Sequence, residues 1–266
     1  MTTQYFIPIL ALVFLYGVII GSFLNVCIYR IPKKENIAIV RSHCMTCDHQ
    51  LKWYDNIPLI SWIMLRGRCR YCKAPISPQY PIIEASNGLL WLLVFTVNAY
   101  AGNNAWSIDA AMIVDSLLYC LLTSALLTLS VIDFRTYEIP IGINIFILAL
   151  GLIMTAYHYT GWLDHVIGFF AVSIPIQIII IATKGRGFGG GDMKLMAVAG
   201  LMLGWKLIVL AFALGCIVGA PIHLIRMKVS GADRVLAMGP YLSVGIFWAF
   251  MWGNSLIDWY LRLAGF

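Results

Sequence analysis

Residues 6–28 read FIPILALVFLYGVIIGSFLNVCI, an uninterrupted run of 23 residues with no charged side chain. About 20 mainly apolar residues are enough for a helix to cross roughly 30 Å of hydrocarbon. In the whole chain, 61% of residues are hydrophobic and 11% are charged, whereas an average soluble domain has about 45–50% and about 25%. The chain is therefore predicted to be an integral membrane protein, with this first run retained as a helix.

Similar apolar runs recur along the chain and predict an all-α polytopic membrane protein with about eight transmembrane helices. The run 195–205 is short for a full crossing, so it either begins inside the preceding glycine-rich segment or forms a broken helix, and the count could be seven. The predicted spans are 6–28, 82–101, 110–132, 139–158, 165–183, 195–205, 207–225 and 236–253.

Composition divides the chain into a first transmembrane helix (1–28), a polar insert (29–81) and a transmembrane bundle (82–266).

Lysine and arginine collect on the cytoplasmic side of membrane proteins. Of the 18 lysines and arginines, 16 fall on one predicted side, nine of them in the insert. This asymmetry predicts an external N-terminus and a cytoplasmic insert, and it accounts for the net charge of +6 without a nucleic-acid partner. The other seven cations on that side are Arg135, Lys184, Arg186, Lys194, Arg226, Lys228 and Arg234.

Two cysteine pairs in the insert predict a metal centre. Cys44-x2-Cys47 and Cys69-x2-Cys72 are 21 residues apart, a spacing typical of zinc ribbons, in which four thiolates hold a tetrahedral Zn2+. An insert of this length needs such support because it is too short to build a stable core alone. Two disulfides are the alternative, and a reducing cytoplasm disfavours them. His43 and His49 are nearby alternative ligands.

Five carboxylates occupy or border the apolar runs, where ionised groups are expensive and usually face a cavity. Asp109 and Asp115 fall at the start of a predicted span, where a helix N-terminus and interfacial water accommodate them. Asp133 ends the third span in SVIDFRTYEIP, and Asp192 opens a later one in KGRGFGGGDMKL, on the same predicted side. The fifth carboxylate is Glu84.

Asp133 and Asp192 are the candidate catalytic pair. Two carboxylates brought together at a partly desolvated boundary share a proton, so that one activates a water while the other donates a proton, as in aspartic proteases. The glycines before Asp192 would let a neighbouring helix or a substrate strand approach its backbone. A flexible turn is the alternative explanation of these glycines. Gly189, Gly191 and Lys194 are expected to support the site.

In order and spacing, stretches from most of the chain resemble the type IV prepilin peptidases. The segment from Asp133 to Pro140 is one of them. The others are GSFLNVCIYRIP (21–32), the cysteine pairs with WYDNIPLISW (53–62) between them, RGRCRYC (66–72), ISPQYPIIE (76–84), GGGDMKLMAVAGLMLGW (189–205) and MGPYL (238–242).

This resemblance implies that Asp133 and Asp192 are a protease dyad in the bacterial inner membrane. It implies cleavage of the basic leader of prepilins or pseudopilins after a glycine, at the cytoplasmic face. It also implies methylation of the new N-terminus with S-adenosylmethionine, an activity tied to Gly67 and Arg68, although no Gly-rich dinucleotide motif is present. Two hypotheses compete with this one: a peptidase without methyl transfer, and a transporter or scaffold with a zinc-stabilised loop. A transporter would be expected to place ionisable residues near the middle of the membrane.

Overall fold

The computed structural model describes residues 3–39, 41–100, 108–185, 188–230 and 237–265. Arg186 and Arg234, two of the cations behind the predicted topology, lie outside these ranges. The described residues are mainly helical and contain no β-strand, only two isolated bridges. The chain divides into two compact units, Met1–Ser124 and Ala125–Phe266.

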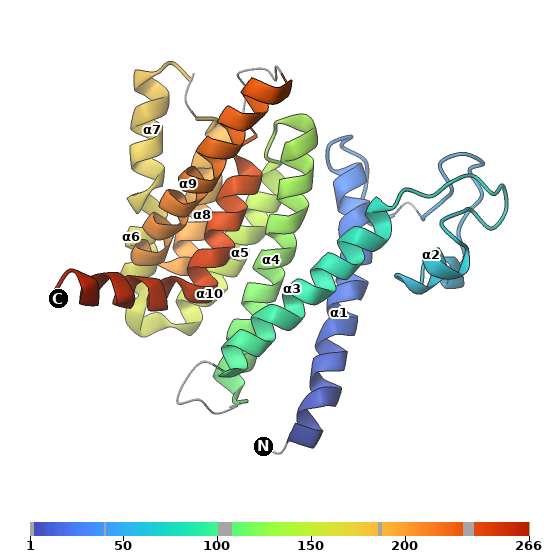
Figure 1. Cartoon of the computed structure of the whole chain (residues 1–266), viewed down its shortest axis with the longest axis horizontal. Coiled ribbons are helices and arrows are strands. Elements are labelled where there is room, and N and C mark those ends of the chain that lie inside the picture. Colours follow the sequence, from blue (N-terminus) through green and yellow to red (C-terminus); the bar gives the residue numbers. More distant parts are fainter. Residues whose placement is uncertain (1–2, 40, 101–107, 186–187, 231–236, 266) are drawn as a thin grey trace. The chain divides into compact units, whose positions relative to one another are not determined.

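The first unit joins a pair of long helices to the polar insert. Helix α1 and helix α3 lie side by side, and the insert leaves from the end of α1 and returns at the start of α3 (Figure 1). Helix α4 begins in this unit and continues into the second. The elements are α1 (Thr3–Arg30), η1 (Trp53–Asp55), α2 (Ile60–Met64), α3 (Gln79–Tyr100) and α4 (Ala110–Thr136).

Small residues and buried polar contacts hold the helices of this unit together. A Cβ added to Gly21 would lie 2.8 Å from the Cα of Glu84, so the backbones of α1 and α3 approach closely there. The amide of Asn87 donates to the carbonyl of Gly17 at 2.7 Å and accepts from the hydroxyl of Ser124 in α4 at 2.9 Å. These contacts satisfy polar groups that water cannot reach.

The second unit is built around α8. Helix α8 packs against five other helices of this unit, and all its residues from Leu195 to Leu203 are buried. Gly168 in α6 and Gly200 in α8 allow the two backbones to approach, because a Cβ on Gly200 would lie 2.1 Å from the carbonyl oxygen of Gly168. The elements are α5 (Ile141–Tyr157), η2 (Tyr159–Gly161), α6 (Trp162–Ala171), α7 (Ser173–Ala182), α8 (Gly190–Leu203), α9 (Trp205–Ser230) and α10 (Gly239–Leu263).

Each predicted span falls on helical structure in its described residues, which leave out 101 and 236, and one span needs a correction. The run 165–183 is two helices that meet at Val172. Pro175 explains the break, because proline lacks an N–H and its ring clashes with the carbonyl four residues earlier, here that of Ala171. Together with η2, the two helices still form one apolar segment, Tyr159–Ala182, long enough to span a membrane.

Five described segments are long and apolar enough to cross a membrane, so the predicted count of about eight transmembrane helices is not confirmed. Helix α8 is not among them: its 14 residues make about 21 Å of helix at 1.5 Å per residue. It begins inside the glycine-rich segment, which is one of the two outcomes expected for the short run 195–205. Gly204, with φ of 82°, ends α8, and α9 starts at the next residue.

Candidate active site and metal centre

Asp133 lies three residues before the end of α4 and is 4% exposed. Its Oδ2 accepts a hydrogen bond of 2.8 Å from the backbone N–H of Gly239, the first residue of α10. A Cβ added to Gly239 would lie 2.7 Å from the same oxygen, so no larger residue fits without moving the carboxylate. The motif MGPYL was noticed in the sequence, but nothing in it indicated this contact with Asp133.

Asp192 lies in the first turn of α8 and is 8% exposed. Its Oδ2 accepts a hydrogen bond of 3.0 Å from the backbone N–H of Gly189, the residue before the helix. The carboxylate thus satisfies a backbone donor at its own helix N-terminus, where the helix dipole also favours negative charge.

The structure brings the segments that carry the two carboxylates together. A Cβ on Gly191 would lie 3.0 Å from the Cβ of Ile139, so the chain that follows α4 touches the start of α8. Asp192 directly follows Gly191, and Asp133 lies six positions before Ile139. Each uses Oδ2 for its backbone donor, and no described residue donates to either Oδ1. One oxygen on each aspartate therefore remains available for a water or a shared proton.

The glycines before Asp192 play different roles. Gly191 is needed for close packing against Ile139, whereas a Cβ on Gly190 would meet no described atom within 4 Å. Lys194 is exposed. A cavity of about 420 Å³ lies beside the Asp133 end of α4, lined by Ser130, Val131, Phe134, Arg135 and Pro240.

The four cysteines of the insert form one cluster. The sulfurs of Cys44, Cys47, Cys69 and Cys72 lie within 4.8 Å of one another, and those of Cys44 and Cys72 are 3.8 Å apart. A tetrahedral Zn2+ with bonds of about 2.3 Å requires sulfurs about 3.8 Å apart, so the cluster fits this ion with little adjustment. The cysteines are free thiols.

The two cysteine pairs share one backbone geometry. In the first, the N–H of Cys44 donates to His49 and the N–H of Asp48 donates to Cys44. In the second, the N–H of Cys69 donates to Ala74 and the N–H of Lys73 donates to Cys69. The fourth residue after each leading cysteine has a positive φ, 54° at Asp48 and 60° at Lys73. This repeat places each sulfur pair on the inside of a tight turn.

The histidines near the first pair lie outside the metal cluster. The ring of His49 packs on that of Tyr71, with centroids 3.6 Å apart, and Nδ1 of His43 lies 3.4 Å from the carbonyl oxygen of Arg41. The four-thiol set therefore needs neither imidazole to be complete.

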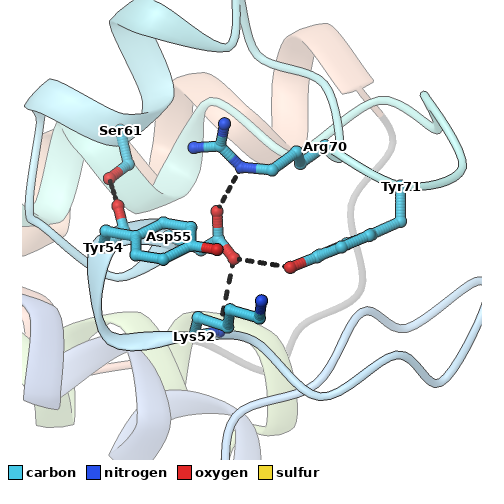
Figure 2. Close-up of polar contacts among 6 residues, drawn as sticks. All are labelled: Lys52, Tyr54, Asp55, Ser61, Arg70 and Tyr71. Atoms are coloured by element: carbon cyan, nitrogen blue, oxygen red, sulfur yellow. Dashed lines mark hydrogen bonds and ion pairs between the residues drawn. The ribbon is translucent and has the colours of Figure 1, made fainter.

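A carboxylate that the sequence did not single out links η1 to the second cysteine pair. Asp55, whose side chain is 2% exposed, accepts hydrogen bonds from Arg70 at 2.7 Å, from Tyr71 at 3.3 Å and from the N–H of Lys52 at 3.2 Å (Figure 2). Burial alone would raise the pKa of Asp55, but these donors hold it below its usual value. Arg70 and Tyr71 lie between Cys69 and Cys72, so Asp55 braces that turn.

Gly67 and Arg68 lie directly before the second pair. Gly67 has φ of 66°, and a Cβ there would lie 2.9 Å from the ring of Trp62, so glycine is required on two counts. Arg68 is exposed and lines a cavity of about 400 Å³ with Leu65, Arg66, Cys69 and Lys73.

Two of the other three carboxylates near membrane runs have local roles. Asp109 accepts the N–H of Met112 at 2.7 Å and so caps α4, as expected from its place at the start of a span. Glu84, in α3, is 6% exposed and accepts the N–H of Leu59 from the insert at 2.8 Å. It ties the insert to the helix.

Comparison with known proteins covers most of the chain. Residues 15–98 match the bacterial peptidase A24 N-terminal domain, and residues 120–224 match the type IV leader peptidase family. The chain is 32% identical to a prepilin leader peptidase/N-methyltransferase of Stutzerimonas stutzeri, over 93% of this chain and 92% of that protein. It is 34% identical to the protein of that name from Aeromonas hydrophila, over 94% of this chain and 93% of that protein. No solved structure matches. The chain belongs to the type IV leader peptidase family.

Proposed function

We propose that this protein is an aspartic endopeptidase of the membrane, with Asp133 and Asp192 as its catalytic pair. The observation behind the proposal is geometric: two buried carboxylates, one near the end of α4 and one at the start of α8, lie on segments that touch at Ile139 and Gly191, and each is held by a single backbone N–H through one oxygen. Membership of a leader peptidase family supports a peptidase. The chemistry of paired carboxylates then supplies the catalytic class.

The pair hydrolyses a peptide bond without a covalent intermediate. Two adjacent carboxylates share one proton because both cannot ionise readily. The ionised group removes a proton from water, whose oxygen attacks the scissile carbonyl carbon, while the protonated group donates to the carbonyl oxygen. Collapse of the tetrahedral intermediate breaks the C–N bond, and a proton passes to the leaving amine. The backbone donors from Gly239 and Gly189 keep both carboxylates oriented during these transfers.

The substrates are prepilins or pseudopilins, since the relatives are named prepilin leader peptidase/N-methyltransferase. We infer that the enzyme removes their basic leader after a glycine, at the cytoplasmic face of the bacterial inner membrane. The asymmetry of lysine and arginine supports this orientation. A reporter fused near residue 60 should be active only in the cytoplasm and one fused near residue 160 only outside; reversed activities would contradict the orientation.

Replacement of each aspartate tests the catalytic pair. Asp133→Asn and Asp192→Asn keep nearly the same shape but remove the acid–base group, so leader removal should be abolished in both. Asp109→Asn is the matched control: it makes the same chemical change at the other end of α4, where asparagine caps a helix as well as aspartate does. Normal processing by either catalytic-pair variant would refute the proposal.

A second activity, N-methylation of the trimmed substrate, is proposed from the names of the relatives, with Gly67 and Arg68 as its residues. S-adenosylmethionine would supply the methyl group. The cavity that Arg68 lines does not fit this donor: its side chains include three cations and neither a carboxylate nor an aromatic ring to face a sulfonium. The donor would therefore bind elsewhere, and Arg68 would support methyl transfer without contacting the donor.

Methyl transfer from radiolabelled donor onto an already cleaved pilin separates the competing hypotheses. Asp133→Asn should retain transfer, and Arg68→Gln should lose it while still removing leaders. A wild-type protein that cleaves but never methylates would be a peptidase alone. A protein that does neither would favour the transporter or scaffold.

We also propose that the four-cysteine cluster holds a structural Zn2+. Its sulfur spacing suits that ion, and four thiolates complete the coordination, leaving no open position for catalysis. Metal analysis of the purified protein should find about one equivalent of zinc. Absence of metal together with absence of free thiols would favour disulfides.

A further inference from the structure

The short helix α2 presents an apolar face to solvent in the first unit. Ile60, Ile63 and Met64 are 54%, 66% and 76% exposed. Their spacing of three and four residues places them on one side of the helix. The opposite side is engaged, since Ser61 is buried and donates to the carbonyl of Tyr54 at 2.7 Å. An aligned group of large apolar side chains of this kind marks an interaction surface.

Uncompensated positive charge adjoins this face. Helix α2 leads directly into the cavity of about 400 Å³, which is lined by Leu65, Arg66, Arg68, Cys69 and Lys73. Within the described parts of the chain none of its three cations makes an ion pair, whereas neighbouring Arg70 is paired with Asp55. The cavity therefore suits an anion, and its charge complements a phosphate.

The anchor of α2 places this surface at the end of a membrane helix. Leu59, the residue before α2, donates its N–H to Glu84 at 2.8 Å. Glu84 lies in the second turn of α3, one of the segments apolar and long enough to span a membrane. Leu59 has φ of 59°, a conformation that a leucine adopts only when its surroundings impose it. The start of α2 is thus fixed beside the second turn of α3.

We propose that α2 and the adjoining cavity form a binding site for the membrane surface, specifically for an anionic phospholipid. Ile60, Ile63 and Met64 enter the boundary between headgroups and acyl chains, as the apolar face of an interfacial helix does. Arg66, Arg68 and Lys73 bind the headgroup phosphate of one lipid in the leaflet where α1 ends and α3 begins. The site uses neither carboxylate of the catalytic pair and stands independently of the proposed peptidase.

Lipid titration of the full-length, metal-loaded protein in a neutral detergent tests the cavity. Native mass spectrometry would follow binding of a short-chain phosphatidylglycerol to wild type, to Arg66→Gln/Lys73→Gln and to the control Arg41→Gln/Lys52→Gln. The control removes the same charge from the same insert, outside the cavity. Each cation near an anionic surface raises the affinity for it about fivefold. The cavity variant, which lacks two cations, should therefore bind the lipid about 25-fold more weakly, whereas the control should bind it about as wild type does.

Equal binding by all three proteins, or an equal loss in both variants, would overturn the site. Two further arms identify the ligand: phosphatidylcholine should bind more weakly than phosphatidylglycerol, and inorganic phosphate should compete poorly. Competition by inorganic phosphate as effective as that of the lipid would overturn the lipid assignment. The metal content of each variant shows that the insert remains folded.

A photo-crosslinking residue, p-benzoylphenylalanine, tests the apolar face in nanodiscs that contain phosphatidylglycerol. Placed at Ile63 it should form lipid adducts, whereas at Met45, an exposed apolar residue of the first cysteine pair, it should form few. Mass spectrometry identifies the adducts. Adducts from position 63 to protein instead of lipid would contradict the proposal, because the face would then be covered by another protein surface.

Discussion

The metal cluster and the carboxylate pair are assembled in opposite ways. In the cluster, the backbone hydrogen bonds that shape each cysteine pair join residues no more than five positions apart, as in Cys44 to His49. In the carboxylate pair, Asp133 is held by Gly239, 106 positions away, and Asp192 comes from another helix whose start touches the chain that follows α4. The cluster is a local structure, whereas the carboxylate pair exists only when α4, α8 and α10 are packed.

This difference predicts that the two sites fail separately. Loss of the metal should disorder a segment of the insert and leave the helix contacts of the second unit in place. Displacement of one backbone donor should damage the carboxylate pair without affecting the metal. A variant at one site that also damages the other would reveal a link between them.

The largest effect is expected for Cys44→Ser/Cys69→Ser. The zinc content should fall from about one equivalent to none, because two of four ligands are lost and metal binding is coupled to folding of the insert. Proteolysis within residues 41–76 should accelerate. Leader removal should persist at a reduced rate, measured on a purified prepilin. Complete loss of cleavage, with α4 and α8 still folded, would show that the sites depend on each other.

Gly239→Ala should lower kcat for leader removal by about 100-fold, because a shift of about 1 Å in a reacting group costs about that much. The added methyl would lie 2.7 Å from Oδ2 of Asp133 and must displace it. KM should change little, and the zinc content should not change. Gly142→Ala is the control, since no described atom lies within 4 Å of its added Cβ. Equal kinetics for the two variants would refute the role of Gly239.

Asp55→Asn should weaken zinc binding by about 10-fold, the lower end of the range for residues that brace metal ligands. The amide cannot accept from Arg70, Tyr71 and the N–H of Lys52 as the carboxylate does. Competition with a chromogenic chelator measures the affinity. Glu35→Gln, which neutralises an exposed acid elsewhere in the insert, should bind zinc as wild type does. An unchanged affinity in Asp55→Asn would contradict the bracing role.

The same contrast explains what could be predicted from the sequence. The helical spans follow from apolar runs, and the cysteine cluster follows from a spacing that fixes its own turns. The break at Val172 could have been read from Pro175, whose effect on the preceding turn is local. The contact of Gly239 with Asp133 could not, because a backbone N–H carries no sequence signal and its partner is set by tertiary packing. Asp55 could not be singled out either, because its side-chain partners Arg70 and Tyr71 lie 15 and 16 positions away and no local spacing connects them.

The central claim is that Asp133 and Asp192 act as one catalytic unit, and a double-mutant cycle tests it most directly. Cleavage rates of a purified prepilin would be measured for Asp133→Asn, Asp192→Asn and the variant with both changes. Residues that act as a unit are strongly non-additive. Each single variant should therefore be as inactive as the double variant. The alternative is that each single variant keeps residual cleavage and that the two losses multiply in the double variant, as they would for two independent groups. That result would contradict the claim.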